Sequence, residues 1–555
     1  MRTDPLPAYR VPRSLAPCDL RLDANEGAVP SADLLDGLDV VDLLRRYPDA
    51  GALEAAIAAR LGRSADEVLV TAGADDGLDR CCRAFLGPDR ALVFPTPGFA
   101  MVPRYARLAG AAIVPIPWAS GPYPVSAALQ AAQRGAGAVL VTSPNNPTGL
   151  VATAADLAAL AAAGVPLIVD LAYAEFGDED LTDAALAHPA AVVLRSLSKA
   201  WGLAGLRVGY AVGPASTIAR LRACGAPYPV SGLSLAVAGR ALAGGDAEVQ
   251  AFVATTRAER YAIEADLTAL GHPPVPSQAN FVLARVPDAR WLRDGLAGLG
   301  IAVRAWEDDP ELANAVRIGC PGDAVALARL RSGIAAVMRP EALLLDLDGV
   351  LADVSRSYRH AIVTTAASFG VAVTADDVRA VKAKGDANND WVVTWRLVTA
   401  AGVAATLAEV TARFEAAYQG TDAAPGLWTT ETALVDAAGW AALRRRFPRI
   451  AIVTGRPRAD AARFLAQHGF GVDALVTLED APPKPNPAPV LAALAALDVH
   501  AAWMVGDTVD DVRAARAAGV VPFGVLAPGD RDPEPLLRAG AARVLPSLST
   551  LLELV

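Results

Sequence analysis

Only four lysines occur among the 555 residues, against 46 arginines; they are Lys199, Lys382, Lys384 and Lys484. Arginine can replace lysine wherever a solvated positive charge is enough, but it cannot form an imine or present a compact ammonium group. A chain that has replaced almost every lysine is therefore expected to keep the amines that its chemistry needs. The alternative is drift in composition that left four lysines by chance, and the residues around Lys199 and Lys484 argue against it.

Lys199 lies in the segment Ser196-Leu-Ser-Lys-Ala-Trp-Gly, which follows an apolar run typical of a buried strand. An amine that condenses with an aldehyde cofactor needs neighbouring groups that anchor the cofactor. The hydroxyls of Ser196 and Ser198 and the guanidinium fork of Arg207 suit a phosphate group. Asp170, at the end of another apolar run, could keep a pyridine nitrogen protonated, which makes the ring an electron sink.

Tyr173 and Asn146 add polar groups to the same stretch. Tyr173 could hydrogen-bond a ring hydroxyl, and Asn146 lies in the polar turn Ser143-Pro-Asn-Asn-Pro-Thr-Gly after an apolar run. Each segment alone is weak evidence, because Asn-Pro-Thr-Gly also forms ordinary turns and Ser-Leu-Ser-Lys also begins helices. Their order and spacing in one chain are specific, and together they predict a lysine that forms an imine.

Two carboxylates two residues apart, Asp346 and Asp348, end a continuous apolar strand. Residues i and i+2 of a strand point the same way, so the two charges would repel unless a cation lay between them. Asp507 and Asp511 follow another apolar run, and oxygen ligands of this kind suit Mg²⁺. The sequence therefore predicts a magnesium site built from these carboxylates.

The remaining lysines and a hydroxyl accompany this second group. Thr454, followed by glycine, offers a hydroxyl and backbone N–H groups for a phosphate, and Lys484 supplies a positive charge in a proline-rich turn. Lys382 and Lys384 lie in a polar segment around a glycine. That segment either faces a substrate or is a solvated loop, and the sequence leaves both readings open.

The elements that must position these residues fall into two α/β stretches. From about residue 20 to 338, short apolar runs alternate with alanine-rich helical segments, which predicts a mostly parallel sheet with ligands at the carboxyl ends of its strands. Arg339-Pro340 marks the junction, because proline ends the preceding helix. The second stretch is interrupted by helical sequence from about 355 to 440, as by an inserted cap.

Composition argues against several classes of function. A length of 555 residues predicts several compact units, and we expect neither a membrane span nor a secretory leader. Five cysteines without a Cys-x-x-Cys spacing fit a reducing cytoplasm. Five scattered histidines form no metal-ligand cluster, and a net charge of −10 without a basic tract argues against a nucleic-acid partner.

Residues 15 to 338 resemble the fold-type I aminotransferases that use pyridoxal phosphate, and among them the histidinol-phosphate aminotransferases. Further matching segments are Leu22-Asp-Ala-Asn-Glu-Gly, Arg46-Tyr-Pro-Asp, Gly73-Ala-Asp-Asp-Gly, Pro95-Thr-Pro-Gly-Phe, Pro227-Tyr-Pro-Val, Ser277-Gln-Ala-Asn-Phe and Val316-Arg-Ile-Gly. The resemblance implies an aminotransferase over residues 1–338, with a large domain at about 40–235 and a small domain from the remaining N- and C-terminal parts.

The resemblance also assigns roles. Lys199 would form the imine with pyridoxal phosphate and shuttle the proton. The implied cofactor contacts are Asp170 at the pyridine nitrogen, Asn146 and Tyr173 at the ring oxygen, Phe99 on the ring face, and Ala74, Asp75, Ser196, Ser198 and Arg207 at the phosphate. Tyr47 would reach the cofactor phosphate of a second subunit, so a homodimer is implied. Arg317, Arg304 and Asn25 would bind substrate, although Arg304 could equally be a solvated charge.

The chain departs from the family at one place. The family usually has Asn-Glu-Asn-Pro followed by an aromatic residue and glycine, whereas this chain has Asn25-Glu26-Gly27-Ala-Val-Pro. The missing aromatic residue belongs to the substrate pocket, so the side chain of the amine donor stays open. Asn280 is a further pocket residue in the family pattern, and an ordinary turn cap explains it equally well.

Residues 341 to 555 resemble the haloacid-dehalogenase superfamily of phosphohydrolases, whose four motifs are all present in order. The resemblance implies a phosphatase core over residues 339–555 with a helical cap at about 355–440. Its residue roles are Asp346 as the nucleophile that becomes an aspartyl-phosphate, Asp348 as general acid and base, Thr454 and Lys484 at the phosphoryl group, and Asp346, the Asp348 carbonyl and Asp507 at Mg²⁺, with Asp511 orienting the loop. Lys384 in the cap would face the substrate.

Together the two resemblances imply a bifunctional enzyme of histidine biosynthesis. The first half would interconvert imidazole-acetol phosphate and glutamate with histidinol phosphate and 2-oxoglutarate, and the second half would hydrolyse histidinol phosphate to histidinol. The product of the first reaction is a phosphate monoester, which the second site consumes. Two alternatives stay open: the same chemistries on another phosphorylated amino alcohol or amino acid, and an aminotransferase that carries a regulatory, non-catalytic second half.

Overall fold

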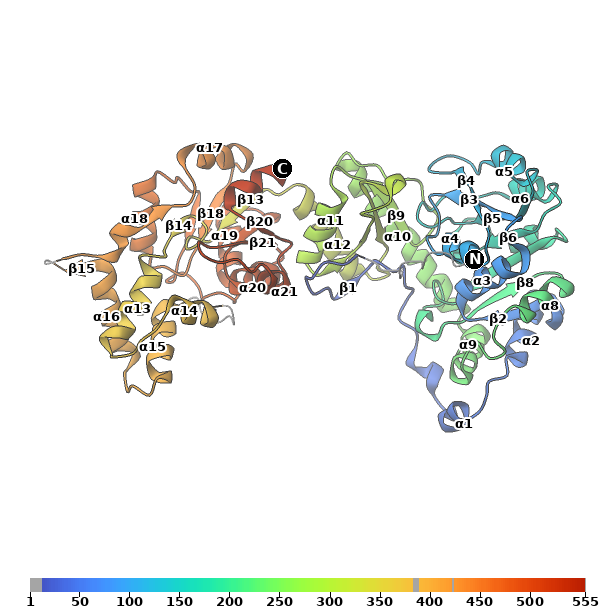
Figure 1. Ribbon diagram of the computed structural model, residues 1–555, viewed down its shortest axis with the longest axis horizontal. Helices are drawn as coiled ribbons and strands as arrows, with labels where there is room; N and C mark the ends of the chain where they lie inside the picture. The colour runs from blue at the N-terminus through green and yellow to red at the C-terminus, as the bar shows by residue number, and fades with distance from the viewer. Residues whose placement is uncertain (1–11, 383–388, 422–423, 555) are drawn as a thin grey trace. The chain divides into compact units, whose positions relative to one another are not determined.

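The protein forms two compact units (Figure 1). The computed structural model describes residues 12–382, 389–421 and 424–554. The first unit consists mainly of Leu22–Ala289 and Val303–Leu327, and the second of Ala328–Val555 with Arg13–Arg21 and Arg290–Ala302. The boundary expected after residue 338 stays a prediction.

A seven-stranded sheet organises the first unit. Its strands are β2 (Val68–Thr71), β3 (Ala91–Thr96), β4 (Ile113–Pro117), β5 (Ala136–Thr142), β6 (Leu167–Asp170), β7 (Ala191–Ser196) and β8 (Gly209–Val212). They lie in the order β2-β8-β7-β6-β5-β3-β4, and all neighbours are parallel except the pairs that β8 makes with β2 and β7. The predicted α/β class with a mostly parallel sheet is confirmed.

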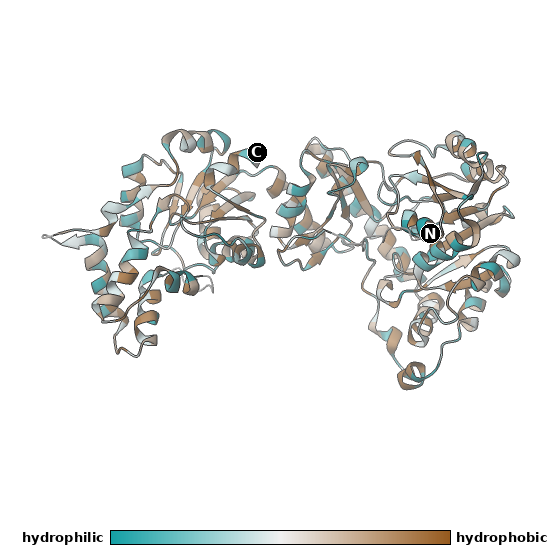
Figure 2. Ribbon diagram, viewed as in Figure 1, coloured by the Kyte–Doolittle hydropathy of each residue, from teal (hydrophilic) through white to brown (hydrophobic). Residues whose placement is uncertain are grey.

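Each face of this sheet has its own hydrophobic core. Val93, Val139 and Val169 pack in one cluster, whereas Leu92 and Leu140 pack in the other. Successive strand residues point to opposite faces, so strands buried on both sides need continuous apolar runs. Figure 2 shows these strands as hydrophobic, with hydrophilic residues on the surrounding helices.

The helices of the first unit are α1 (Val40–Arg45), α2 (Gly51–Arg60), α3 (Gly73–Phe85), α4 (Val102–Leu108), α5 (Val125–Ala132), α6 (Ala154–Ala161), α7 (Thr182–Leu186), α8 (Ala215–Ala223), α9 (Gly232–Gly244) and α10 (Asp246–Ala269). A smaller antiparallel sheet joins β9 (Phe281–Arg285), β12 (Ala315–Gly319) and β11 (Arg304–Ala305). Its register places Arg304 directly opposite Arg317, so the two predicted substrate arginines are cross-strand neighbours.

A six-stranded parallel sheet organises the second unit, in the order β19-β18-β13-β20-β21-β22. Its strands are β13 (Ala342–Leu345), β18 (Ile450–Val453), β19 (Ala474–Val476), β20 (Ala502–Gly506), β21 (Val521–Val525) and β22 (Arg543–Leu545). The helices that follow in the chain are α17 (Ala437–Arg446), α18 (Arg458–His468), α19 (Ala488–Leu497), α20 (Val509–Ala517) and α21 (Glu534–Ala539). Because β13 lies between β18 and β20, the residues that follow these three strands meet at one sheet edge.

The same unit contains two helices and a short strand pair from earlier in the chain. These elements are α11 (Ala289–Gly298), α12 (Ala324–Met338), β1 (Leu20–Arg21) and β10 (Ile301–Ala302). Trp291 of α11 stacks on Phe523 of β21, and the indole of Trp503 in β20 donates to the Ala336 carbonyl of α12 at 2.8 Å. Through these two tryptophans, α11 and α12 pack against the six-stranded sheet.

A helical insert follows β13, as the sequence predicted. Its helices are α13 (Tyr358–Ser368), α14 (Ala375–Lys382), α15 (Asp390–Ala400) and α16 (Leu407–Gln419), which lie together beside the sheet in Figure 1. Two short antiparallel strands, β14 (Ala352–Asp353) and β17 (Thr432–Ala433), connect the insert to the sheet. Among the described residues, no helix is both long enough and apolar enough to span a membrane.

Candidate active sites

Lys199 lies just beyond β7, in the turn that the sequence marked as the source of an amine. Its ammonium group donates to the carbonyl of Ala24 at 3.1 Å and lies 5.5 Å from the centre of the Tyr173 ring. The N-terminal segment that carries Ala24 therefore lies against the candidate amine. Tyr173 follows the neighbouring strand β6, so two adjacent strand ends supply these groups.

Asp170 is the last residue of β6 and is almost fully buried. One carboxylate oxygen accepts the Ala172 N–H at 3.1 Å. Burial and, to a smaller extent, Asp75 raise the pKa of Asp170 to about 7, although the Ala172 hydrogen bond and Lys199 oppose the shift. A buried carboxylate in this state fits a protonated ring nitrogen, because that cation would supply the missing charge.

Several groups that suit a phosphate lie at the start of α3. The N–H groups of a helix's first turn have no partner within the helix and favour anions, and Ala74 and Asp75 lie in that turn. Arg207 donates to the Ser198 hydroxyl at 3.4 Å and to the Asp75 carboxylate at 3.1 Å. The Ser196 hydroxyl accepts the Ser198 N–H at 3.1 Å. The structure thus brings all five predicted phosphate contacts together.

A hydrogen-bonded chain connects the predicted ring-oxygen and substrate residues. The Tyr173 hydroxyl accepts the amide groups of Asn25 at 3.2 Å and Asn146 at 3.4 Å. The Asn146 oxygen accepts Arg317 at 2.6 Å, and Arg317 also donates to the Asp23 carbonyl at 2.7 Å. A guanidinium next to the candidate ring site suits a carboxylate or phosphate substrate.

Trp306 is a residue of this region that sequence reasoning missed. The guanidinium groups of both Arg304 and Arg317 lie over its ring, at 5.4 and 6.0 Å. Arg304 is 7% exposed, so the solvated-charge interpretation does not describe it. The amide of Asn280 donates to the Asn25 carbonyl at 3.3 Å, so Asn280 holds the N-terminal segment at the pocket.

Phe99 and Tyr47 lie differently from the other predicted cofactor residues. Phe99 is partly buried against the core cluster under α3 and α4. Tyr47 is 84% exposed and stacks on Tyr228 with ring centres 4.9 Å apart. The contact of Tyr47 with the cofactor of a second subunit stays a prediction.

Gly27 lies in the segment that departs from the family pattern. A β-carbon built at Gly27 would lie 1.7 Å from the Lys199 carbonyl oxygen and 2.8 Å from the Gly202 nitrogen. Real β-carbons do not approach so closely, so only glycine fits between these backbone atoms. The departure from the family pattern thus coincides with a backbone packed directly against the Lys199 turn.

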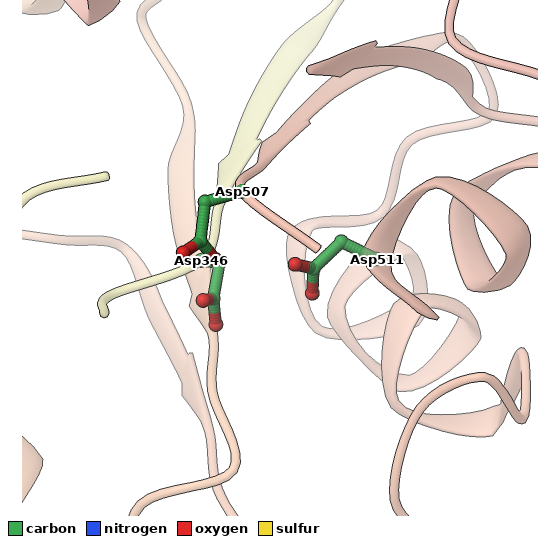
Figure 3. A group of neighbouring side chains, drawn as sticks. All are labelled: Asp346, Asp507 and Asp511. Carbon is green, nitrogen blue, oxygen red and sulfur yellow. The ribbon is translucent and has the colours of Figure 1, made fainter. Parts of the chain in front are cut away.

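Three carboxylates converge in the second unit (Figure 3). Oxygens of Asp346, Asp507 and Asp511 all lie within 4.8 Å of one another. Asp346 follows β13 and Asp507 follows the adjacent strand β20, and their carboxylates point toward each other. Three clustered anions of this kind suit a hard divalent cation with oxygen ligands.

Burial makes two of these carboxylates, Asp346 and Asp507, weaker acids than usual. It raises the pKa of Asp346 to about 7 even though Lys484 opposes the shift, and it raises that of Asp507 well above its ordinary value, with Asp511 and Asp346 adding to the rise. A bound cation would reverse both shifts, because it stabilises the ionised forms. The raised pKa values of Asp346 and Asp507 within one carboxylate cluster are therefore the observation that fits a metal ion.

Lys484 is 4% exposed and lies inside the same cluster. It donates to Asp346 at 2.8 Å and to the Val453 carbonyl at 3.0 Å, and it pairs with Asp511. Burial alone would lower the pKa of Lys484, but Asp346 and Asp511 outweigh burial and raise it. The ammonium group therefore stays charged beside the candidate nucleophile.

Asp511 has partners that limit its role at a metal. Its second oxygen accepts the Thr508 N–H at 3.0 Å and the Thr508 hydroxyl at 2.6 Å, which caps α20. With Lys484 on the other oxygen, both oxygens of Asp511 have partners in the chain, and the implied role of Asp511 in orienting the loop stays a prediction. Thr454 follows β18, is buried, and accepts the Arg456 N–H at 3.2 Å, so its hydroxyl lies at the same sheet edge.

Arg456 and Glu431 are buried residues of this site that sequence reasoning missed. Arg456 donates to Asp348 at 2.7 Å and to Glu431 at 2.9 Å. The signal was present in the sequence, because Arg456 follows Thr454-Gly directly at a strand's carboxyl end. Glu431 carried no such signal, since it lies between the insert and β17, far along the chain from its partners.

A cavity of about 330 Å³ lies beside Asp507, between α13, α14 and the loop after β21. Arg359, Arg379 and Lys382 give it a basic lining, and Asp507 and Asp530 an acidic one. Arg359 lies 3.5 Å from Asp507 and 3.7 Å from Asp530. A cavity that opens on a candidate metal ligand suits the leaving group of a phosphate ester.

Lys382 and Lys384 have different outcomes. Lys382 lines this cavity and pairs with Asp390 at 2.8 Å, which brings it to the candidate site. Lys384 lies outside the described residues.

Comparison with known proteins finds a matching family model in each half of the chain. A family model described as aminotransferase class I and II matches residues 42–334, and one described as haloacid dehalogenase-like hydrolase matches residues 340–519. The first match covers more than half of the chain. The chain therefore belongs to the aminotransferase class I and II family, fused to a haloacid dehalogenase-like hydrolase, and both parts are enzymes.

Two relatives have names that refer to imidazole-containing phosphate compounds. A histidinol-phosphate aminotransferase of Xylella fastidiosa is 36% identical over 336 residues, which cover 58% of this chain and 91% of that protein. An imidazoleglycerol-phosphate dehydratase of Phytophthora nicotianae is 50% identical over 238 residues, covering 39% of this chain and 52% of that protein. The chain thus spans about half the length of this second relative.

Solved structures show the same fold. Histidinol-phosphate aminotransferase from Sinorhizobium meliloti, in complex with pyridoxal-5'-phosphate, gives a TM-score of 0.52 at 26% identity and covers 58% of this chain and 92% of that one. N-Succinyldiaminopimelate aminotransferase from Mycobacterium tuberculosis gives a TM-score of 0.51 at 23% identity over 58% of this chain and 93% of its own, which shows the fold alone. The predicted fold-type I architecture is confirmed.

Proposed function

We propose that this chain performs two consecutive reactions. The first half transfers the amino group of glutamate to imidazole-acetol phosphate, which yields histidinol phosphate and 2-oxoglutarate. The second half hydrolyses histidinol phosphate to histidinol and inorganic phosphate. The observation that carries the proposal is that both constellations are complete in one chain: a lysine beside a phosphate cradle, and three carboxylates around a lysine.

Pyridoxal phosphate fits the first constellation and, when bound, supplies the electron sink for amino transfer. Asp170 would pair with its ring nitrogen, and the start of α3 with Arg207 and Ser198 would hold its phosphate. Lys199 would carry a proton at its Nζ atom. Arg317, held by Asn146, would bind the anionic end of each substrate.

The second constellation supports phosphoryl transfer to a carboxylate. An oxygen of Asp346 attacks phosphorus, the bond between phosphorus and the ester oxygen breaks, and Asp348 gives its proton to the departing alcohol. Asp348 then takes a proton from water, whose oxygen attacks phosphorus and releases phosphate and the free Asp346 carboxylate. Asp346 and Asp507 would hold Mg²⁺, which shields the charge of the phosphoryl group.

The names of two relatives favour an imidazole substrate. One is named for histidinol phosphate and the other for imidazoleglycerol phosphate, and both compounds are phosphate esters of an imidazole-bearing alcohol. The altered Asn25-Glu-Gly27 segment supports a second candidate, in which both halves act on another phosphorylated amino alcohol.

The assembly and location belong to the same proposal. The exposed Tyr47 and the apolar residues near it support a homodimer, in which Tyr47 reaches the partner's cofactor phosphate. None of the five cysteines forms a disulfide bond, which supports a reducing, cytoplasmic location. The net charge of −10 supports small-molecule substrates rather than a nucleic-acid partner.

A one-pot assay tests the proposal. The purified chain with pyridoxal phosphate, Mg²⁺, imidazole-acetol phosphate and glutamate should release histidinol and inorganic phosphate. Histidinol phosphate without free phosphate would refute the phosphatase half. Faster transamination of other phosphorylated amines would refute the histidinol assignment. Lys199→Ala should lose the visible absorbance of the cofactor while it keeps phosphate release from added histidinol phosphate.

A further inference from the structure

Arg456 is one of the largest fully buried side chains of the protein, with an exposed fraction of 2%. A buried guanidinium is costly unless carboxylates and hydrogen bonds compensate its charge. Arg456 has two carboxylates and a tyrosine hydroxyl as partners, and its guanidinium lies 4.8 Å from the centre of the Tyr358 ring. The site therefore surrounds this one cation from several elements.

The contact with Asp348 uses two nitrogens of the guanidinium. Nε donates to Asp348 Oδ1 at 2.7 Å, and Nη2 lies 2.5 Å from the same oxygen. Neither contact involves Oδ2, so Arg456 fixes the carboxylate and leaves its second oxygen for another partner. Asp348 lies two residues after Asp346, and a small cavity lined by Asp348, Tyr358 and Asn389 adjoins it.

The third nitrogen connects this pair to the helical insert. Nη1 donates to Glu431 Oε2 at 2.9 Å, and Glu431 Oε1 accepts the hydroxyls of Ser357 at 2.8 Å and Tyr418 at 3.0 Å. Glu431 directly precedes β17, one of the two short strands that connect the insert to the sheet. Contacts with the insert thus hold Arg456 in place, and Arg456 in turn holds Asp348.

We propose that Arg456 is the positioning residue that holds Asp348 for proton transfer, with Glu431 and Tyr418 holding Arg456 in turn. This inference rests on the phosphatase function proposed above. The planar fork of arginine binds two carboxylates in fixed directions, which a lysine ammonium cannot do. Proton transfer needs heavy atoms within hydrogen-bond reach, so a carboxylate free to rotate donates its proton less often.

The test compares two phosphate esters that differ in their need for a proton. The leaving group of an alkyl phosphate is a strongly basic alkoxide unless an acid protonates its oxygen. The leaving group of p-nitrophenyl phosphate is a weakly basic phenolate, which needs no proton. The quantity to measure is kcat/KM of the full chain with Mg²⁺, because it reports the steps up to departure of the leaving group. A role through Asp348 affects the alkyl ester selectively.

Arg456→Met should lower kcat/KM for an alkyl phosphate roughly 10- to 100-fold and that for p-nitrophenyl phosphate less than about threefold. Arg456→Lys should restore part of the loss, because it keeps the charge without the fork. In an Asp348→Asn background, Arg456→Met should add no further selective loss, because it acts through the residue already changed.

Arg463→Met is the matched control. Arg463 of α18 also contacts the insert, through Gln419 of α16 at 3.2 Å, and it pairs with Asp460 of its own helix at 2.8 Å, but it has no contact with Asp348 among its recorded partners. Arg463→Met should lower kcat/KM for both esters by the same factor or leave both values unchanged. Hydrolysis of p-nitrophenyl phosphate by each variant checks that the second unit is folded, and transamination checks the first unit.

Two results would overturn the inference. Equal losses for both esters in Arg456→Met would show a structural role for Arg456 rather than a role in proton transfer. No loss at all would show that Asp348 needs no positioning. If the unmodified chain hydrolyses neither ester, the proposed phosphatase function itself fails, and this outcome is distinct from the other two.

Discussion

Asp170 and Asp346 share one physical situation at the residue scale. Each lies at the carboxyl end of a central strand, and burial raises the pKa of each to about 7. A carboxylate in that state gains most from a cation that arrives with the ligand. The ring nitrogen of pyridoxal phosphate would be that cation for Asp170, and Mg²⁺ would be that cation for Asp346.

The raised pKa of Asp170 predicts how stability depends on pH. Its folded value of about 7 lies above the ordinary value of 3.8, so the folded chain binds this proton more tightly than the unfolded chain. The stabilisation is complete below about pH 4 and is lost as pH rises toward 7. Without pyridoxal phosphate, the first unit should be less stable at pH 7.5 than at pH 5.5 by roughly 2 kcal/mol from this group.

Urea unfolding of the cofactor-free chain at the two pH values measures this effect. Asp170→Asn should remove that part of the pH dependence, whereas Asp178→Asn, at an exposed carboxylate, should leave it unchanged. An identical pH dependence in Asp170→Asn and the unmodified chain would contradict the prediction. Adding pyridoxal phosphate should also reduce the pH dependence, since the ring nitrogen would compensate the ionised carboxylate.

The rare lysines give a second prediction at this scale. Lys382 lines the cavity beside Asp507 and pairs with Asp390, so a bulkier guanidinium there should disturb the leaving-group side of the site. Replacing both Lys382 and Lys384 by arginine should lower phosphatase kcat/KM roughly fivefold, the equivalent of about 1 kcal/mol, and leave transamination unchanged. Unchanged phosphatase kinetics would show that the rarity of lysine carried no meaning in the insert.

At the scale of elements, both sites lie at the carboxyl ends of neighbouring strands. Asp170 and Ser196 end the adjacent strands β6 and β7, and Asp346, Thr454 and Asp507 follow the adjacent strands β13, β18 and β20. Hydrogen bonding between the strands sets the spacing of these side chains. Short loops after the strands then aim them, so the backbone of a loop can matter as much as a catalytic side chain.

Gly349 provides the test of such a loop. Its φ is +74°, and a β-carbon there would lie 2.2 Å from Asp507 Oδ2. Gly349→Ala should therefore displace the Asp507 carboxylate, raise the Mg²⁺ concentration needed for half-maximal phosphatase activity and lower kcat at least about tenfold. Mg²⁺ titrations of phosphate release measure both effects.

Gly370→Ala is the matched control for backbone strain. Gly370 has nearly the same φ, +77°, but a β-carbon there meets no atom within 4 Å. Its alanine variant should lose a similar amount of stability and keep its Mg²⁺ dependence. Equal Mg²⁺ dependence in the two variants would show that Gly349 contributes strain relief alone.

At the scale of the whole molecule, two features bear on function: the fusion of two enzymes and the exposed apolar surface of the first unit. Linking two enzymes raises the effective concentration of an intermediate at the second site without any new contact. The first unit also exposes large apolar side chains along one chain segment: Val41 at 76%, Leu44 at 71% and Tyr47 at 84%. Such a group is typical of a surface that another protein chain covers.

Leu44→Glu should therefore convert a dimer into a monomer. A charge buried at the proposed interface is costly, and loss of the partner's Tyr47 should lower transamination roughly tenfold or more. Phosphatase activity should stay unchanged. Light scattering gives the mass, and Leu108→Glu, at a leucine 69% exposed on α4, is the control that should remain dimeric. A monomeric unmodified chain would contradict the prediction.

The sequence by itself determined the fold class and the two families, and it indicated candidate residues for the chemistry of both sites. Continuous apolar runs require strands buried on both faces, and the polar residue after each run must then lie at the strand's carboxyl end. Lys199, Asp170, Asp346 and Asp507 were predictable for this reason. Their types and order along the chain carried the information.

Only the tertiary structure decided which distant residues hold these groups. Glu431 meets Arg456 across the connection between insert and sheet, and Gly27 packs against Lys199, 172 positions further along the chain. Strand periodicity fixes where a side chain points within its own element, but it says nothing about which loop packs against it. Burial, and with it the raised pKa of Asp170, likewise arises only when the whole chain has excluded water.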